Sequence, residues 1–125
     1  LAAERRNGDC VRALILGGAV LACHDCADGG LLVTVAEMCM ASGVGATLSL
    51  VADHGAWFGE DQARYVLATR DAEAVLAAAR AAHVPAMRLG HSGGGDLVVP
   101  GAGSISVARL RGLNEATLPE MMRGY

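Results

Sequence analysis

Two carboxylates and a pair of glycines lie close together early in this chain. Asp25 and Asp28 are followed directly by Gly29 and Gly30, and then by apolar residues at helical spacing. Carboxylates are hard oxygen ligands that suit Mg²⁺, and the exposed amides at a helix N-terminus attract phosphate. The segment therefore predicts a site for magnesium and phosphate. The residue types suggest Asp25 and Asp28 as the metal ligands.

The same residues also fit a tight strand-to-helix turn that binds no ligand. Asp28 is a favourable N-cap residue, and Gly29 and Gly30 adopt backbone angles that other residues avoid. Such caps occur at most helices, so the pattern by itself leaves both interpretations open.

Hydrophobic periodicity predicts the elements that position this turn. Apolar residues at helical or alternating spacing, bounded by glycine, proline and capping residues, indicate helices over 2–16, 29–42, 72–83 and from Ser106, and strands over 19–23, 46–51, 63–69, 87–91 and 96–99. We expect Asp71 to cap the third helix, the run 92–95 to join two strands as a hairpin, and the tail 118–122 to pack on the body. The order predicts an α+β fold: a mixed sheet of about four strands with packed helices, related to the ferredoxin-like split βαβ unit.

Composition narrows the class of protein. The 125 residues fit one domain, and 53% are hydrophobic, mostly small aliphatic side chains. The net charge of -3 comes without a basic stripe, so nucleic acid is not an expected partner. No apolar run reaches the roughly 20 residues that span a bilayer, and the N-terminus lacks the order of a signal peptide. We expect a cytoplasmic protein that does not bind membranes.

Cysteine and histidine offer weaker candidates for chemistry. Cys23 and Cys26 form a C-x-x-C pair, which suggests redox or zinc chemistry, but no second pair completes a zinc site. Buried free thiols are the expected state of all four cysteines, which are Cys10, Cys23, Cys26 and Cys39. The four histidines show no metal-ligand spacing.

Two separated stretches, 24–38 and 58–66, together resemble one protein family. They carry His-Asp-Cys-Ala-Asp-Gly-Gly-Leu with Ala-Glu-Met, and Phe-Gly-Glu-Asp-Gln-Ala-Arg-Tyr-Val; residues 1–9, 105–110 and 118–119 fit as well. The chain resembles the C-terminal subdomain of the phosphoribosylformylglycinamidine synthase family, within the aminoimidazole ribonucleotide synthetase-like superfamily. The resemblance implies that residues 1–125 are a single C-terminal subdomain of a larger synthetase.

The resemblance also implies an activity and its partners. The family converts formylglycinamide ribonucleotide, glutamine-derived ammonia and ATP to formylglycinamidine ribonucleotide, ADP and phosphate in purine biosynthesis. The implied cofactors are Mg²⁺ and ATP, and the implied partners are the remaining domains of the synthetase, a glutaminase subunit and a small accessory subunit. Because the family's active-site clefts lie between subdomains, this chain alone is expected to be inactive.

The same resemblance assigns residues. Asp25 stands where the family places a magnesium ligand. Asp28, Gly29 and Gly30, at the start of the predicted helix, are the residues expected to bind nucleotide phosphate, and Asp28 ranks below Asp25 because it also fits a helix cap. Glu60, Asp61 and Gln62 match a triplet that the family offers to the ribonucleotide substrate. The chain departs from the family at Cys26-Ala27, where Val-Ser is usual, and at Asp61, which replaces Ser or Ala. The loss of the hydroxyl at Ala27 affects phosphate binding and leaves Asp25 untouched.

Two other hypotheses stand beside this one. The chain is a structural and docking subdomain with a degenerate nucleotide site, or it belongs to a relative such as selenophosphate synthetase or the hydrogenase maturation dehydratase. The run 58–62 and the opening 1–9 argue against the latter. An isolated subdomain is expected to expose an apolar patch and to self-associate.

Overall fold

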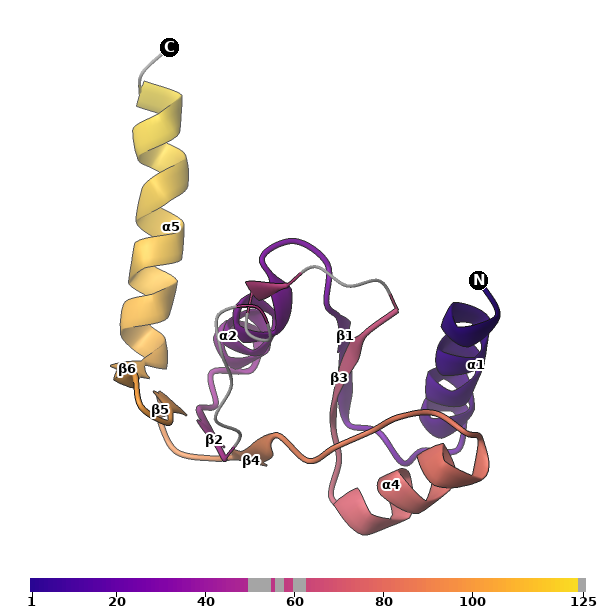
Figure 1. The fold of residues 1–125 in the computed structure, drawn as a ribbon. Coiled ribbons are helices and arrows are strands. Elements are labelled where there is room, and N and C mark those ends of the chain that lie inside the picture. The colour runs from indigo at the N-terminus through magenta and orange to yellow at the C-terminus, as the bar shows by residue number, and fades with distance from the viewer. Residues whose placement is uncertain (50–54, 56–57, 60–62, 124–125) are drawn as a thin grey trace. The chain divides into compact units, whose positions relative to one another are not determined.

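A computed structural model describes residues 1–49, 55, 58–59 and 63–123, with side chains described up to residue 116. Figure 1 shows its elements along the chain. They are α1 (Ala2–Leu16), β1 (Ala22–Asp25), α2 (Gly30–Ser42), β2 (Ala46–Leu48), β3 (Tyr65–Ala68), α4 (Ala72–Ala81), β4 (Gly90–Ser92), β5 (Asp96–Val99), β6 (Gly103–Ser106) and α5 (Val107–Arg123).

The predicted α+β class with a mixed four-stranded sheet is confirmed. The helices lie close to their predicted bounds, because apolar periodicity and end signals agree for each of them. Asp71 caps α4, as predicted, by accepting a 3.0 Å hydrogen bond from the Ala74 amide. Throughout the described ranges, no helix combines the length and apolarity that crossing a membrane requires.

The chain forms two compact units, each with its own sheet. Unit 1 comprises Leu1–Thr34 and Ala52–Arg88, and unit 2 comprises Val35–Val51 and Leu89–Tyr125. The division passes through α2, whose first turn belongs to unit 1.

Unit 1 contains an antiparallel ribbon of β1 and β3. Its register pairs Ala22 with Ala68 and Asp25 with Tyr65. The predicted strands 19–23 and 63–69 therefore pair with each other and stand outside the four-stranded sheet. Alternation identifies a strand but carries no information about its partner, so the sequence did not reveal this separation.

Exposure in unit 1 differs from the prediction of a buried first strand. Three of the four residues of β1 are exposed, and α1 buries none of its residues. Leu16 and Leu21 are 77% and 61% exposed. Among the residues of this unit that the structure describes, the buried side chains are Cys26, Leu31, Thr34, Val66, Val75 and Ala79. Unit 1 thus presents a substantial apolar surface to solvent.

Unit 2 contains the mixed sheet, with the strand order β4-β2-β5-β6. β2 is antiparallel to β4 and parallel to β5, while β5 and β6 are antiparallel. The hairpin predicted for 92–95 is therefore wrong, because β2 lies between β4 and β5. The glycine run connects them across the start of β2, where Gly93 donates to the Gly45 carbonyl and the Gly45 amide donates to the Gly94 carbonyl.

Glycine allows these backbones to approach one another. A Cβ at Gly45 would collide with the Asp96 carbonyl oxygen and lie 2.6 Å from the Asp96 nitrogen. A Cβ at Gly90 would collide with the Thr47 carbonyl oxygen. The central position of β2 therefore depends on the absence of a side chain at these two positions.

The last strand and helix complete unit 2. β6 was not predicted, and it pairs with β5 directly before α5. The Ser106 hydroxyl accepts a 3.1 Å hydrogen bond from the Arg109 amide, as expected of an N-cap. Arg111 of α5 donates through Nε to the Met40 carbonyl in the last turn of α2, at 2.7 Å. Leu113 of α5 is 56% exposed.

We expect Gly45→Ala to lower the free energy of unfolding by about 2 to 3 kcal/mol, because the new methyl group forces β2 away from β5. Gly95→Ala is the matched control, since a Cβ there meets no atom within 4 Å. Urea denaturation of both variants measures the effect. Equal stability of the two variants would contradict the role assigned to Gly45.

Candidate functional site

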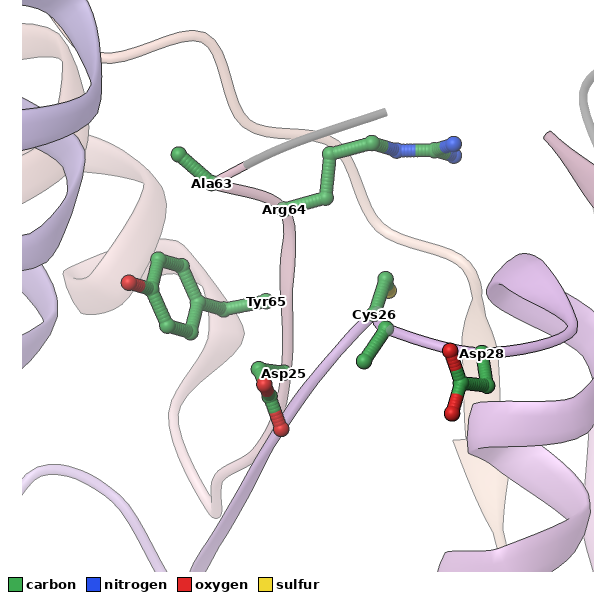
Figure 2. Close-up of a pocket in the computed structure, with 7 residues that line it drawn as sticks. Asp25, Cys26, Asp28, Ala63, Arg64 and Tyr65 are labelled. Carbon is green, nitrogen blue, oxygen red and sulfur yellow. The ribbon is translucent and has the colours of Figure 1, made fainter. Parts of the chain in front are cut away.

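A pocket of about 310 Å³ in unit 1 gathers residues from the turn after β1 and from the start of β3 (Figure 2). Its lining residues are Asp25, Cys26, Ala27, Asp28, Ala63, Arg64 and Tyr65. The two walls are far apart in sequence and are joined by the β1–β3 pairing. Two aspartates, an arginine and a tyrosine are therefore among the residues that line the pocket.

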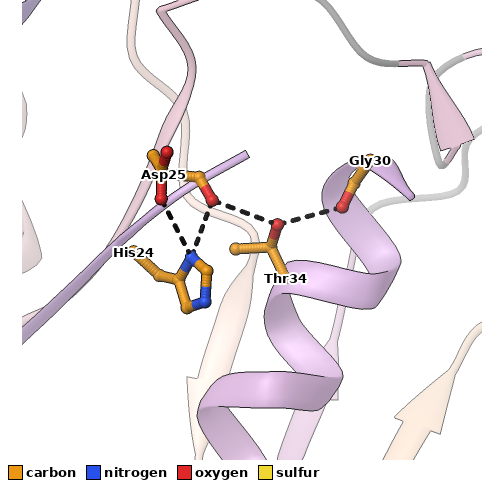
Figure 3. Close-up of polar contacts among 4 residues, drawn as sticks. All are labelled: His24, Asp25, Gly30 and Thr34. Carbon is orange, nitrogen blue, oxygen red and sulfur yellow. Dashed lines mark hydrogen bonds and ion pairs between the residues drawn. The ribbon is translucent and has the colours of Figure 1, made fainter. Parts of the chain in front are cut away.

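The peptide group between Asp25 and Cys26 is held at both of its ends. Its N–H, on Cys26, donates a 2.8 Å hydrogen bond to the Arg64 carbonyl. Its carbonyl oxygen, on Asp25, lies 2.7 Å from His24 Nδ1 and 3.4 Å from the Thr34 hydroxyl (Figure 3). These contacts hold the backbone where β1 leads into the acidic turn.

Thr34 links this peptide to the helix that follows. Its hydroxyl donates at 3.0 Å to the Gly30 carbonyl and points at longer range to the Asp25 carbonyl. Thr34 is only 1% exposed, and no other polar side chain in the described part of the chain is as deeply buried. A buried hydroxyl requires such partners, because leaving it unpaired costs about 1 to 3 kcal/mol.

Two glycines shape the turn between Asp28 and α2. Gly29 and Gly30 have φ angles of +84° and +78°, so the predicted need for glycine here is confirmed. A Cβ at Gly29 would also lie 2.8 Å from the Val33 side chain. The helix begins at Gly30, which makes Gly29, and not Asp28, the residue directly before it.

The electrostatics of the pocket suit a hydrated cation near a phosphate. The Asp25 side chain is 68% exposed, and its Oδ1 lies 3.4 Å from His24 Nδ1. Mg²⁺ in proteins is commonly held by one or two carboxylates together with water and substrate phosphates. Asp25 and Asp28 are the two carboxylate residues in this pocket lining. Among the described residues no group of three or more His, Cys, Asp or Glu side chains could hold a metal.

The cysteines are free thiols that differ in exposure. Cys26 and Cys39 are buried, as expected, whereas Cys10 is half-buried and Cys23 is exposed, which contradicts the prediction for Cys23. Loss of hydration and then the Asp25 carboxylate raise the pKa of the Cys23 thiol, and burial raises the pKa of Cys39. Raised pKa values disfavour the reactive thiolate, which argues against a redox role for the C-x-x-C pair.

The structure brings together only part of the predicted site. Asp25 and Asp28 line one pocket, and Gly29 and Gly30 lie in the adjoining turn. Glu60, Asp61 and Gln62 lie outside the described residues. Arg64 and Tyr65 were not predicted as site residues, although they directly follow the triplet in the stretch 58–66.

The fold and the pocket define a class of protein: an α+β domain whose pocket is lined by an acidic turn and by an arginine. Residues 1–101 match the family model described as AIR synthase related protein, C-terminal domain. The chain belongs to this family.

Curated relatives make the resemblance more specific. The chain is 62% identical over 126 aligned residues to the phosphoribosylformylglycinamidine synthase subunit PurL of Gluconobacter oxydans, and 59% identical over 122 to that of Granulibacter bethesdensis. Each alignment covers 98% of this chain and 17% of the relative. The chain thus spans about a sixth of the length of these relatives. The predicted resemblance to this synthase family is confirmed.

A solved structure supports the fold. The chain matches the structure titled T. maritima PurL complexed with FGAR with a TM-score of 0.73 and 17% identity. The match covers 86% of this chain and 21% of that one.

We expect Asp25→Asn to speed the alkylation of Cys23. Removing the negative charge lowers the pKa of the thiol, so more thiolate is present at a given pH. The charge lies near solvent, which limits the gain to roughly two- to threefold. Iodoacetamide labelling followed by peptide mass spectrometry measures the rate, with Asp9→Asn as a charge-matched control. Equal rates in the two variants would count against coupling between Asp25 and Cys23.

Proposed function

We propose that this chain is the C-terminal part of an ATP-dependent amidoligase that makes formylglycinamidine ribonucleotide in purine biosynthesis. The substrates are formylglycinamide ribonucleotide, ATP and glutamine-derived ammonia, and ADP and phosphate are the other products. The observation that carries the proposal is the 62% identity to a synthase subunit over 98% of this chain. Because the chain spans 17% of that relative, the activity is proposed for the longer protein.

In this proposal Asp25 is a ligand of Mg²⁺. The ion would screen the charge of a transferring phosphoryl group. Asp28 lies in the same pocket and orients water around the ion, while the amides of Gly29 and Gly30 face the nucleotide phosphates. Arg64, on the opposite wall, adds a positive charge that matches an anionic ligand.

Glu60, Asp61 and Gln62 complete the proposed site by binding the ribonucleotide substrate. Carboxylate and amide groups suit this task, since they pair with ribose hydroxyls and amide hydrogens. The proposed partners are the remaining domains of the synthetase, a glutaminase subunit and a small accessory subunit, and the proposed location is the cytoplasm.

The alternative function is a structural and docking subdomain with a degenerate nucleotide site. The exposure of α1 and of Leu16 and Leu21 favours this alternative, because such apolar surface is suited to a protein contact. Ala27, which lacks the hydroxyl usual in the family, favours it as well. The two functions differ in whether Asp25 takes part in nucleotide binding.

We expect Asp25→Asn, made in the full-length synthase that carries this chain, to weaken Mg²⁺-dependent ATP binding about tenfold or more. A neutral amide is a poorer ligand for a hard cation than a carboxylate. Equilibrium dialysis with and without Mg²⁺ measures the change, and Asp9→Asn, on the exposed surface of α1, is the control. Unchanged binding in Asp25→Asn would favour the docking function.

Glutamine-dependent turnover of the full-length protein tests the overall activity. We expect formylglycinamidine ribonucleotide and ADP to appear in equal amounts when all substrates are present. A full-length protein that binds ATP and makes no amidine would overturn the assigned reaction.

The isolated chain is expected to show no turnover and to bind an apolar dye. Its exposed leucines offer the surface for dye binding and for self-association. Fluorescence with a naphthalene sulfonate dye and sedimentation at increasing concentration measure both properties. A strictly monomeric chain without dye binding would contradict the prediction that this surface is a contact face.

A further inference from the structure

We infer that Thr34 is a positioning residue for the acidic turn, holding the Asp25–Cys26 peptide and with it the backbone path that places Asp25 and Asp28 in the pocket lining. The inference rests on the proposed function of that pocket. Thr34 does not line the pocket, so it acts through the backbone of Asp25.

The geometry around one peptide group carries the inference. On one side the Cys26 amide donates to the Arg64 carbonyl at 2.8 Å, which attaches the turn to β3. On the other side the Asp25 carbonyl faces the Thr34 hydroxyl, which attaches the turn to α2. A peptide group held on both sides cannot rotate without breaking a hydrogen bond. The two contacts therefore hold the backbone path from Asp25 into the turn that carries Asp28.

Because Thr34 is buried, water cannot replace the partners of its hydroxyl. At 1% exposure the Thr34 hydroxyl has no access to bulk water, so its hydrogen is shared between the Gly30 and Asp25 carbonyls. His24 Nδ1 also contacts the Asp25 carbonyl, but its ring is on the exposed side, where water competes. We therefore expect that loss of the Thr34 hydroxyl loosens the backbone at Asp25.

A hydroxyl elsewhere in the same helix provides the control. Ser42 donates to the Met38 carbonyl four residues earlier at 2.9 Å, which is the same kind of bond that Thr34 makes to Gly30. Ser42 is exposed and belongs to unit 2, whereas Thr34 belongs to unit 1. Ser42→Ala thus removes a comparable helix bond without touching the acidic turn.

The experiment uses full-length synthase and Mn²⁺ with ATP as the probe, because Mn²⁺ accepts the same oxygen ligands as Mg²⁺. Electron paramagnetic resonance measures bound Mn²⁺, and the component that Asp25→Asn removes defines this site. We expect Thr34→Val to weaken that component by about three- to tenfold, the usual effect of losing one buried hydrogen bond. Thr34→Ser, which keeps the hydroxyl, and Ser42→Ala are expected to stay within about twofold of the unaltered protein.

Thermal unfolding shows whether each variant is folded, and Thr34→Ala replaces Thr34→Val if the latter is not. Unaltered binding in the hydroxyl-free variant overturns the inference while the proposed function stands. Equal weakening in Thr34→Ser and Thr34→Val also overturns it, because the hydroxyl would then be irrelevant. If Asp25→Asn removes no bound Mn²⁺, the proposed site fails and the inference fails with it.

Discussion

The hydrogen bonding of one peptide group, between Asp25 and Cys26, connects β1, β3 and α2 beside the pocket of unit 1. Its N–H is tied to the carbonyl of Arg64 before β3, and its carbonyl faces Thr34 in the first turn of α2. Both partners lie in buried or half-buried surroundings, where hydrogen bonds are stronger and their loss is more costly than at the surface. The acidic turn is therefore a consequence of how β1, β3 and α2 meet.

In unit 2, close approach of backbones determines the arrangement of the strands. The mixed sheet places β2 between two strands that follow each other in the chain, and this arrangement brings Gly45 against Asp96 and Gly90 against Thr47. Side chains at either position would push the strands apart, so small residues allow the strand order. In both units, contacts of the backbone determine which strands become neighbours.

The exposed apolar surface fits with the greater length of the relatives. α1 buries none of its residues, and β1 is mostly exposed, although their apolar patterns are those of covered elements. The chain spans about a sixth of the relatives that it matches, and the proposed synthetase provides the further domains that would cover such faces.

The sequence by itself determined the helices, their caps at Asp71 and Ser106, the glycines of the acidic turn and membership of the synthase family, because these depend on local spacing and on short motifs. Only the tertiary structure decided that β1 pairs with β3, that β2 separates β4 from β5, and that Arg64 and Thr34 meet the turn of Asp25. The Thr34 contact joins residues 9 positions apart, and the pairing of β1 with β3 joins residues 40 or more positions apart. A periodic pattern shows which face of an element is apolar, but not what lies against that face.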